Sequence, residues 1–168
     1  VKDSAIERFE IHGASVKPGK EKKPPLDVVL RCESLSDHLC KTDDVSKWKL
    51  VSPLQTKADD TTVNSLLKNL GNLKADDSVD LSKETPEKRS SLLKDYGLDS
   101  ESRKDPKTRR IVVARSGGPT TTVYFGAKSP IGDSTFALVQ TGDSTDESKV
   151  DVVPGWQLSV FDQKTSYF

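Results

Sequence analysis

The stretch KWKLVSPLQTKADDTTVNSLLKNLG, residues 47–71, contains a strand, a polar bend and the start of a helix within one short run. Pro53 ends the strand, because proline cannot donate a hydrogen bond to a sheet ladder. Asp59 or Asp60 is placed to cap the helix, whose apolar residues recur at helical spacing. Gly71 is expected to close the helix in a left-handed conformation. Every part of this stretch therefore has a structural explanation.

The rest of the chain predicts more strands than helices. Alternating or apolar runs predict strands at 5–13, 26–33, 47–51, 108–116, 120–126, 134–142 and 148–153. Thr85 and Pro86 mark the start of a second helix, which runs to Tyr96 and ends at Gly97. A short helical segment or turn is expected at 154–161. The fold class expected from this order is α+β, with antiparallel sheet and two to three helices packed on one face.

Length and charge limit the classes of protein that fit. With 168 residues, the chain is expected to form a single domain over 1–168. Twenty-six basic residues balance 26 acidic ones, so no excess of positive charge is available for nucleic acid, and no such partner is predicted. The basic cluster at 17–23 is interpreted as a solvated loop. The chain starts at Val1 without methionine, which favours a fragment of a longer protein whose targeting segment lies elsewhere.

Cys32 and Cys40 are the only cysteines, with His38 between them. Their spacing differs from a zinc motif, which uses closer pairs and a second pair elsewhere. A disulfide between them suits an oxidising compartment and would stabilise the fold by about 2–3 kcal/mol. Two free buried thiols are the alternative, and the disulfide is the favoured interpretation.

Candidate chemical motifs fall short of recognisable sites. The segment 142–148 has the composition of a calcium loop but lacks its order of aspartates and its final glutamate. Residues 36–38 place Ser, Asp and His side by side, whereas a catalytic triad assembles from distant positions. His12 ends a predicted strand and has no evident partner. No catalytic, cofactor-binding or metal-binding residue is predicted, and the chain is not expected to be an enzyme.

The two tryptophans have two interpretations. Trp48 and Trp156 each lie in an apolar pattern typical of a core residue. They could instead form an interaction surface on which a ligand stacks. The second interpretation requires at least one of them to be exposed.

The stretch around the first helix resembles domain-of-unknown-function family 4340. The matching residues are Trp48, Leu50, Pro53, Ala58, Asp59, Val63, Leu66, Leu67 and Leu70. The turn YGLD at 96–99 and the hairpin at 124–139 are also similar to that family, and the resemblance extends from Ala5 to Phe161. The segments 34–46 and 99–107 depart from the family pattern, the first as an apparent insertion.

The resemblance implies a bacterial envelope protein, anchored by an N-terminal membrane helix and often built from tandem domains. Such proteins accompany ABC transporters related to the gliding-motility auxiliary system, and the family has no established catalytic residues. The expected function is a non-catalytic extracytoplasmic module that contacts transporter subunits or other envelope proteins. A carbohydrate-binding or peptide-binding domain is the second hypothesis, and an enzyme is the third.

Overall fold

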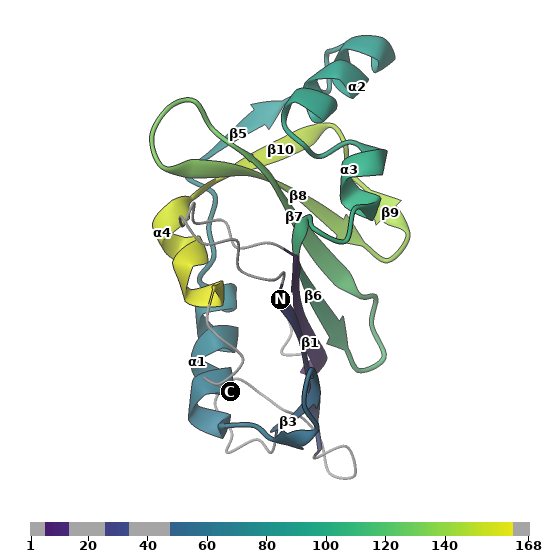
Figure 1. Ribbon diagram of the computed structural model, residues 1–168. Helices are drawn as coiled ribbons and strands as arrows, with labels where there is room; N and C mark the ends of the chain where they lie inside the picture. Colours follow the sequence, from purple (N-terminus) through teal and green to yellow (C-terminus); the bar gives the residue numbers. More distant parts are fainter. Residues whose placement is uncertain (1–5, 14–25, 34–47, 163–168) are drawn as a thin grey trace.

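The computed structural model describes residues 6–13, 26–33 and 48–162, and these form mainly one antiparallel sheet (Figure 1). Strands hold 43 % of the described residues and helices 26 %. The strands are β1 (Ile6–Gly13), β2 (Leu26–Cys32), β3 (Trp48–Ser52), β4 (Thr56–Lys57), β5 (Asp77–Asp80), β6 (Arg109–Arg115), β7 (Thr121–Lys128), β8 (Ser134–Thr141), β9 (Ser144–Thr145) and β10 (Lys149–Pro154). The helices are α1 (Asp60–Gly71), α2 (Pro86–Asp95), α3 (Ser100–Lys104), α4 (Gly155–Leu158) and the 3-10 turn η1 (Ser159–Phe161). The predicted loop at 17–23 and insertion at 34–46 lie outside the described residues.

The strand order places the N-terminal strand in the middle of the sheet. The order is β4-β3-β2-β1-β6-β7-β8-β10-β5, and β9 pairs with β8 beside this path. Gly117 and Gly118 lie in the connection between the paired strands β6 and β7, and the strands predicted at 134–142 and 148–153 pair with each other as β8 and β10. Because β1 lies between β2 and β6, the two halves of the chain share one sheet.

The first hydrophobic core lies between α1 and one face of the sheet. Alternate residues of β1, β2, β3 and β6 face it, as expected from the two-residue period of a strand, and Phe9, Leu30 and Trp48 are fully buried there. Helix α1 contributes its predicted apolar stripe, of which Val63, Leu66 and Leu67 are buried and Leu70 is partly buried. Leu158 and Phe161 extend this core from α4 and η1.

A second hydrophobic core lies on the opposite face, towards the other end of the sheet. In β8, Phe136 and Leu138 belong to the second core, whereas Ala137 between them belongs to the first. Leu93 of α2 is buried in the second core, and the ring of Tyr96 stacks on Phe136 with centroids 4.2 Å apart. Strand β8 is therefore buried on both of its faces.

The predicted arrangement of two or three helices on one face is wrong. In Figure 1, α1 and α4 lie on one side of the sheet, and α2 lies on the other side with α3 beside it. The longest helix has 12 residues, and sheet rather than helix dominates the described chain. Each apolar stripe could be found from sequence, but the face that a helix covers depends on the path of the chain across the sheet.

The helix starts follow the predicted capping chemistry. The Asp59 side chain accepts a hydrogen bond from the Thr62 backbone N–H at 2.7 Å. The neighbouring Asp60 instead accepts from the Trp48 N–H at 2.9 Å, which joins the start of α1 to β3. Thr85 caps α2 by accepting from a backbone N–H at 3.3 Å. The Asp59–Asp60 pair is therefore structural.

The helix ends differ from each other. Gly97 follows α2 with φ +66°, so its predicted role as a left-handed terminator is confirmed. Gly71 was expected to do the same for α1, and this is wrong. Gly71 is the last helical residue, and Asn72 ends the helix at φ −93° with bonds from its N–H to the carbonyls of Lys68 and Asn69. A tightened last turn satisfies those carbonyls without a left-handed residue.

A buried ion pair joins β6 to the end of the described chain. The Arg109 guanidinium donates to the carbonyl of Phe161 and to the Asp162 carboxylate, the latter at 2.8 Å. Both charged side chains are almost fully buried. Burial lowers the pKa of Arg109, and the Asp162 charge opposes that shift. The pair therefore holds η1 against the first core.

Candidate functional site

The side of β1, β2, β3 and β6 that faces away from α1 has a polar, partly exposed surface. We call this surface the open face, and its residues are Arg8, Glu10, His12, Asp27, Val29, Arg31, Lys49, Lys57, Arg110, Val112 and Ala114. They alternate with the core residues along their strands, so they point to the opposite side of the sheet. Each of these side chains is classed as partly or fully exposed, in contrast to the first core.

A chain of ion pairs and hydrogen bonds between side chains crosses the open face. Arg8 Nε lies 2.7 Å from one oxygen of Glu10, and the other Glu10 oxygen lies 2.6 Å from His12 Nε2. His12 Nδ1 lies 2.6 Å from Asp27 Oδ1. The hydroxyl of Ser52 donates to Asp27 Oδ2 at 3.3 Å, which brings β3 into the network. Three strands are thus connected by one polar network.

His12 lies between two carboxylates, and this fixes its role in the network. A carboxylate only accepts hydrogen bonds, so both ring nitrogens donate when the imidazole carries two protons. The His12 hydrogen bond is the main cause that lowers the pKa of Glu10, against the opposing effect of burial. The charge of Arg8 lowers it further. The arrangement therefore stabilises the ionised form of Glu10.

The partners of His12 were missed by sequence reasoning. Arg8, Glu10 and His12 occupy alternate positions of one strand, and this signal was present in the sequence. The partner across the strands, Asp27, could not be assigned, because the register that pairs it with His12 depends on a long connecting segment. The prediction that His12 has no partner is wrong.

A row of cationic residues runs across four adjacent strands. Arg8 lies in register with Arg31, Arg31 with Lys49, and Lys49 with Lys57. We call these four residues the basic row. Residues directly opposite each other point to the same face, so the four charges are neighbours on one surface. Within the described ranges, only Arg8 of the four forms an ion pair.

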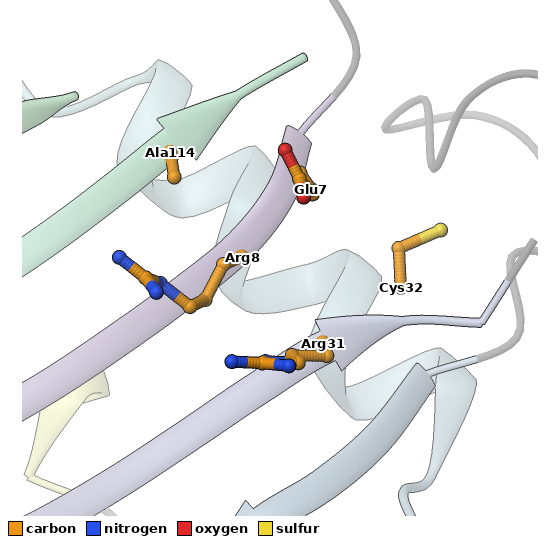
Figure 2. A pocket seen from close by; sticks show the side chains of 5 residues that line it. All are labelled: Glu7, Arg8, Arg31, Cys32 and Ala114. Carbon is orange, nitrogen blue, oxygen red and sulfur yellow. The ribbon is translucent and has the colours of Figure 1, made fainter. Parts of the chain in front are cut away.

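A shallow hollow opens at the Arg8–Arg31 end of the basic row. Its lining residues are Glu7, Arg8, Arg31, Cys32 and Ala114, and its volume is about 230 Å³. Figure 2 shows the side chains of Arg8 and Arg31 extending alongside each other from adjacent strands, with the small Ala114 on the strand beyond. The register of β1 against β6 shifts between Ile6 and Arg8, so Glu7 lies at a bulge on the rim. Paired guanidinium groups of this kind suit an oxyanion.

The two cysteines are only partly described. Cys32 is buried at the end of β2, with 4 % of its surface exposed. Cys40 lies outside the described residues. The predicted bond between them stays a prediction.

The tryptophans occupy opposite environments. Trp48 is fully buried in the first core, whereas Trp156, at the start of α4, is 73 % exposed. Ile131, in the β7–β8 loop, is 83 % exposed. The Gly155 N–H donates to the Asp133 carbonyl at 2.6 Å, which brings the segments of Trp156 and Ile131 to the same corner of the molecule. We call Ile131 and Trp156 the apolar corner.

The backbone around Trp156 is held on a second side. The Gln157 side chain accepts from the Lys74 N–H at 3.0 Å and donates to the Lys74 carbonyl at 3.2 Å. The Ser159 hydroxyl donates to the Trp156 carbonyl at 2.8 Å. Because this backbone is already fixed, binding of a partner restricts the side chain of Trp156 but does not also have to order its backbone.

A second hollow, of about 210 Å³, lies between α2, the start of α3 and the loop before β10. Its charged residues have partners within the fold. Arg89 donates to the carbonyl of Leu81 at 3.2 Å, and Glu147 accepts from Arg103 at 2.7 Å. Asp99 bonds to Ser102, which lowers the pKa of that carboxyl. These contacts fix α2 and α3 and leave this hollow with a structural explanation.

The segments that the structure describes lack both a cluster of metal ligands and a membrane-spanning helix. They contain no group of three or more His, Cys, Asp or Glu side chains placed to hold a metal ion. None of their helices is long and apolar enough to cross a membrane.

Comparison with known proteins identifies a family. The model for a family described as "Domain of unknown function (DUF4340)" matches residues 48–163, more than half of the chain. The match begins at Trp48, so it is shorter than the resemblance predicted from Ala5 onward. Strands β1 and β2, with Arg8 and Arg31, precede the matched segment. No curated protein and no solved structure gives a significant match.

Proposed function

Since the chain belongs to the DUF4340 family of domains of unknown function, we propose that it is a non-catalytic interaction module that acts outside the cytoplasm beside an ABC-type transporter. Its partners in this proposal are transporter subunits or other envelope proteins. The transporter context comes from the family resemblance. The structural support comes from the surface of the domain.

The observation that supports this role most directly is the apolar corner. Trp156 is 73 % exposed and Ile131 is 83 % exposed, although most other large apolar side chains of the described residues are buried or partly buried. Tryptophan is enriched among the residues that dominate binding energy in protein interfaces. An exposed indole on a backbone that hydrogen bonds hold in place is well suited to fill a pocket on a partner.

The test uses the full-length parent protein in its native membrane. A photo-reactive amino acid replaces Trp156, and after illumination the cross-linked proteins are identified by mass spectrometry. The matched control replaces Leu54, another apolar residue that is 65 % exposed but lies in the turn between β3 and β4. We expect transporter subunits to cross-link from position 156 and not from position 54. Equal products from both positions, or only self-products from position 156, would contradict the proposal.

The extracytoplasmic location needs its own test. The proposal predicts that Trp156 and the surrounding loops lie outside the cytoplasmic membrane in intact cells. A protease added to cells with a permeabilised outer layer should then degrade the domain while a cytoplasmic marker stays intact. Protection of both proteins would contradict this location.

A second candidate function is a binding domain for carbohydrate or peptide, because Trp156 is exposed as that role requires. The chain has two tryptophans, and Trp48 is fully buried. A ligand that stacks on Trp156 should therefore change the fluorescence of the wild-type domain but not that of Trp156→Phe. Oligosaccharides and short peptides are the probes, and an equal change in both proteins would exclude stacking at this site.

A further inference from the structure

The basic row is an unusual arrangement in a sheet. Like charges directly opposite each other on neighbouring strands destabilise the pairing, and here three such pairs follow one another: Arg8–Arg31, Arg31–Lys49 and Lys49–Lys57. Within the described residues, Arg31, Lys49 and Lys57 have no ion-pair partner. Among the described residues, no carboxylate offsets the repulsion at Arg31, Lys49 and Lys57, and an anionic partner would do so.

We propose that the basic row binds an extended acidic peptide segment of a partner protein. This inference rests on the proposed role as an interaction module, but it uses a surface separate from the apolar corner. Arg8 and Arg31 mark one end of the binding surface, and Lys57 marks the other.

The shape of the row favours a chain over a flat surface. Neighbouring strands lie about 4.8 Å apart, so the three steps from Arg8 to Lys57 span roughly 14 Å. The row is one residue wide, and Glu10 and the exposed Asp27 lie on the same face beside it. A planar membrane would contact these carboxylates together with the row, whereas a single extended chain can follow the row past them.

The neighbours of the row favour a peptide over other linear polyanions. Val29 and Val112 lie in register with Glu10 on its two sides, and both are only partly buried. Ala114, also partly buried, lies in register with Arg8. A peptide offers aliphatic and acidic side chains together, whereas polyphosphate has no apolar group to cover these residues.

The hollow at one end supplies the strongest single contact. Two guanidinium groups extend along it from adjacent strands (Figure 2), and a guanidinium can bind a carboxylate through two parallel hydrogen bonds. Its volume of about 230 Å³ admits one carboxylate-bearing side chain. The first acidic side chain of the peptide would occupy this hollow, and the following ones would face Lys49 and Lys57.

The first experiment measures fluorescence anisotropy of a labelled short peptide of alternating Glu and Val at low salt. The variant is Arg31→Glu combined with Lys49→Glu, and the control is Lys83→Glu combined with Lys107→Glu, which makes the same change in net charge at exposed sites elsewhere. We expect the Kd to rise at least tenfold in the variant and less than twofold in the control. Equal effects of the two pairs, or no binding by the wild type, would overturn the proposal.

Three other probes distinguish the class of ligand. Polyphosphate and vesicles containing phosphatidylglycerol are titrated under the same conditions, together with a peptide in which Gln replaces Glu. We expect the Glu–Val peptide to bind the wild type at least tenfold more tightly than the Gln peptide and more tightly than either polyanion. Tighter binding of vesicles or polyphosphate, with loss in the Arg31→Glu/Lys49→Glu variant, would show an anion site for a different ligand and overturn the peptide assignment.

A stability measurement shows whether the row serves binding rather than the fold. Lys49→Glu places a carboxylate between Arg31 and Lys57 and converts two repulsive pairs into attractive ones. We expect Tm to rise by a degree or more while peptide binding weakens. A fall in Tm would indicate a structural role and overturn the proposal. These readouts do not involve position 156, so the inference and the proposed function can fail separately.

Discussion

Strand β8 and strand β1 belong to the same sheet, but β8 is buried on both faces and β1 on only one. Phe136 and Leu138 of β8 face the core beneath α2, and Ala137 faces the core beneath α1. In β1, Phe9 and Ile11 face α1, while the alternate residues Arg8, Glu10 and His12 form the charged network of the open face. The same two-residue alternation therefore gives two buried faces in β8 but one buried and one charged face in β1.

This difference in burial separates strands that serve only packing from strands that can also carry a binding surface. Where both faces are covered, each residue of a strand contributes to packing, and few positions are free to change. Where one face is open, alternate positions can be charged without loss of core, which is the condition that a binding surface requires.

The largest loss of stability is expected at the ion pair that holds η1 against the first core. Arg109→Met removes one partner of the buried ion pair and leaves Asp162 as an uncompensated buried charge. Loss of one partner from such a pair costs about 3–5 kcal/mol. Urea unfolding followed by circular dichroism measures the change. A cost near zero would show that η1 is not held by this pair.

A somewhat smaller effect is expected on the second face of β8. Leu138→Ala removes a side chain that is 1 % exposed, and such truncations cost about 2–5 kcal/mol through lost burial and a residual cavity. The same unfolding experiment applies. If the cost is below about 1 kcal/mol, the second core is weakly packed and β8 does not differ from β1 as described.

Truncation of the matching residue on the open face should destabilise the protein less. Val112 of β6 lies on the same side of the sheet as Leu138, but it is only partly buried. Val112→Ala is expected to cost about 1 kcal/mol or less, in proportion to the apolar area that it removes. Comparing the two alanine variants in one denaturant series would sharpen the contrast. Equal costs would mean that the open face is covered after all.

The smallest change in stability is expected from the charge network of the open face, and this change depends on pH. Glu10 has a pKa below its usual 4.5 in the folded protein, chiefly because of its bond to His12. Its contribution to stability is therefore present above pH 4.5 and is lost as pH falls through the folded value. Glu10→Gln should destabilise the protein at pH 6 and flatten the fall of Tm below pH 4.5. Parallel curves for the two proteins would show that the network is not formed.

Local structure was largely predictable, since it depends on neighbouring residues. The cap at Asp59, the apolar stripe of α1 and the terminator at Gly97 follow from side-chain chemistry within one or two helical turns. Gly71 was the exception, because Asn72 can satisfy the last carbonyls without a left-handed glycine. The burial of Trp48 also agrees with its apolar pattern.

The registers between strands were not predictable, so the residues that share the open face could not be grouped from the sequence. The basic row exists only because three separate registers align Arg8, Arg31, Lys49 and Lys57. A shift of one residue in any of them would move a charge to the other face. The covering of both faces by short helices was also missed. It depends on which strand each helix follows, which the sequence does not reveal locally.

The central place of β1 has a consequence for the order in which the protein can fold. β1 pairs with β2 soon after both are synthesised, but its other edge stays unpaired until β6 emerges, because Phe9 pairs with Val113. Pairings between such distant segments close late and slow folding. A chain that stalls after α2 would expose the β1 edge to neighbouring chains. The step most exposed to aggregation during biosynthesis is therefore the interval before β6 is available.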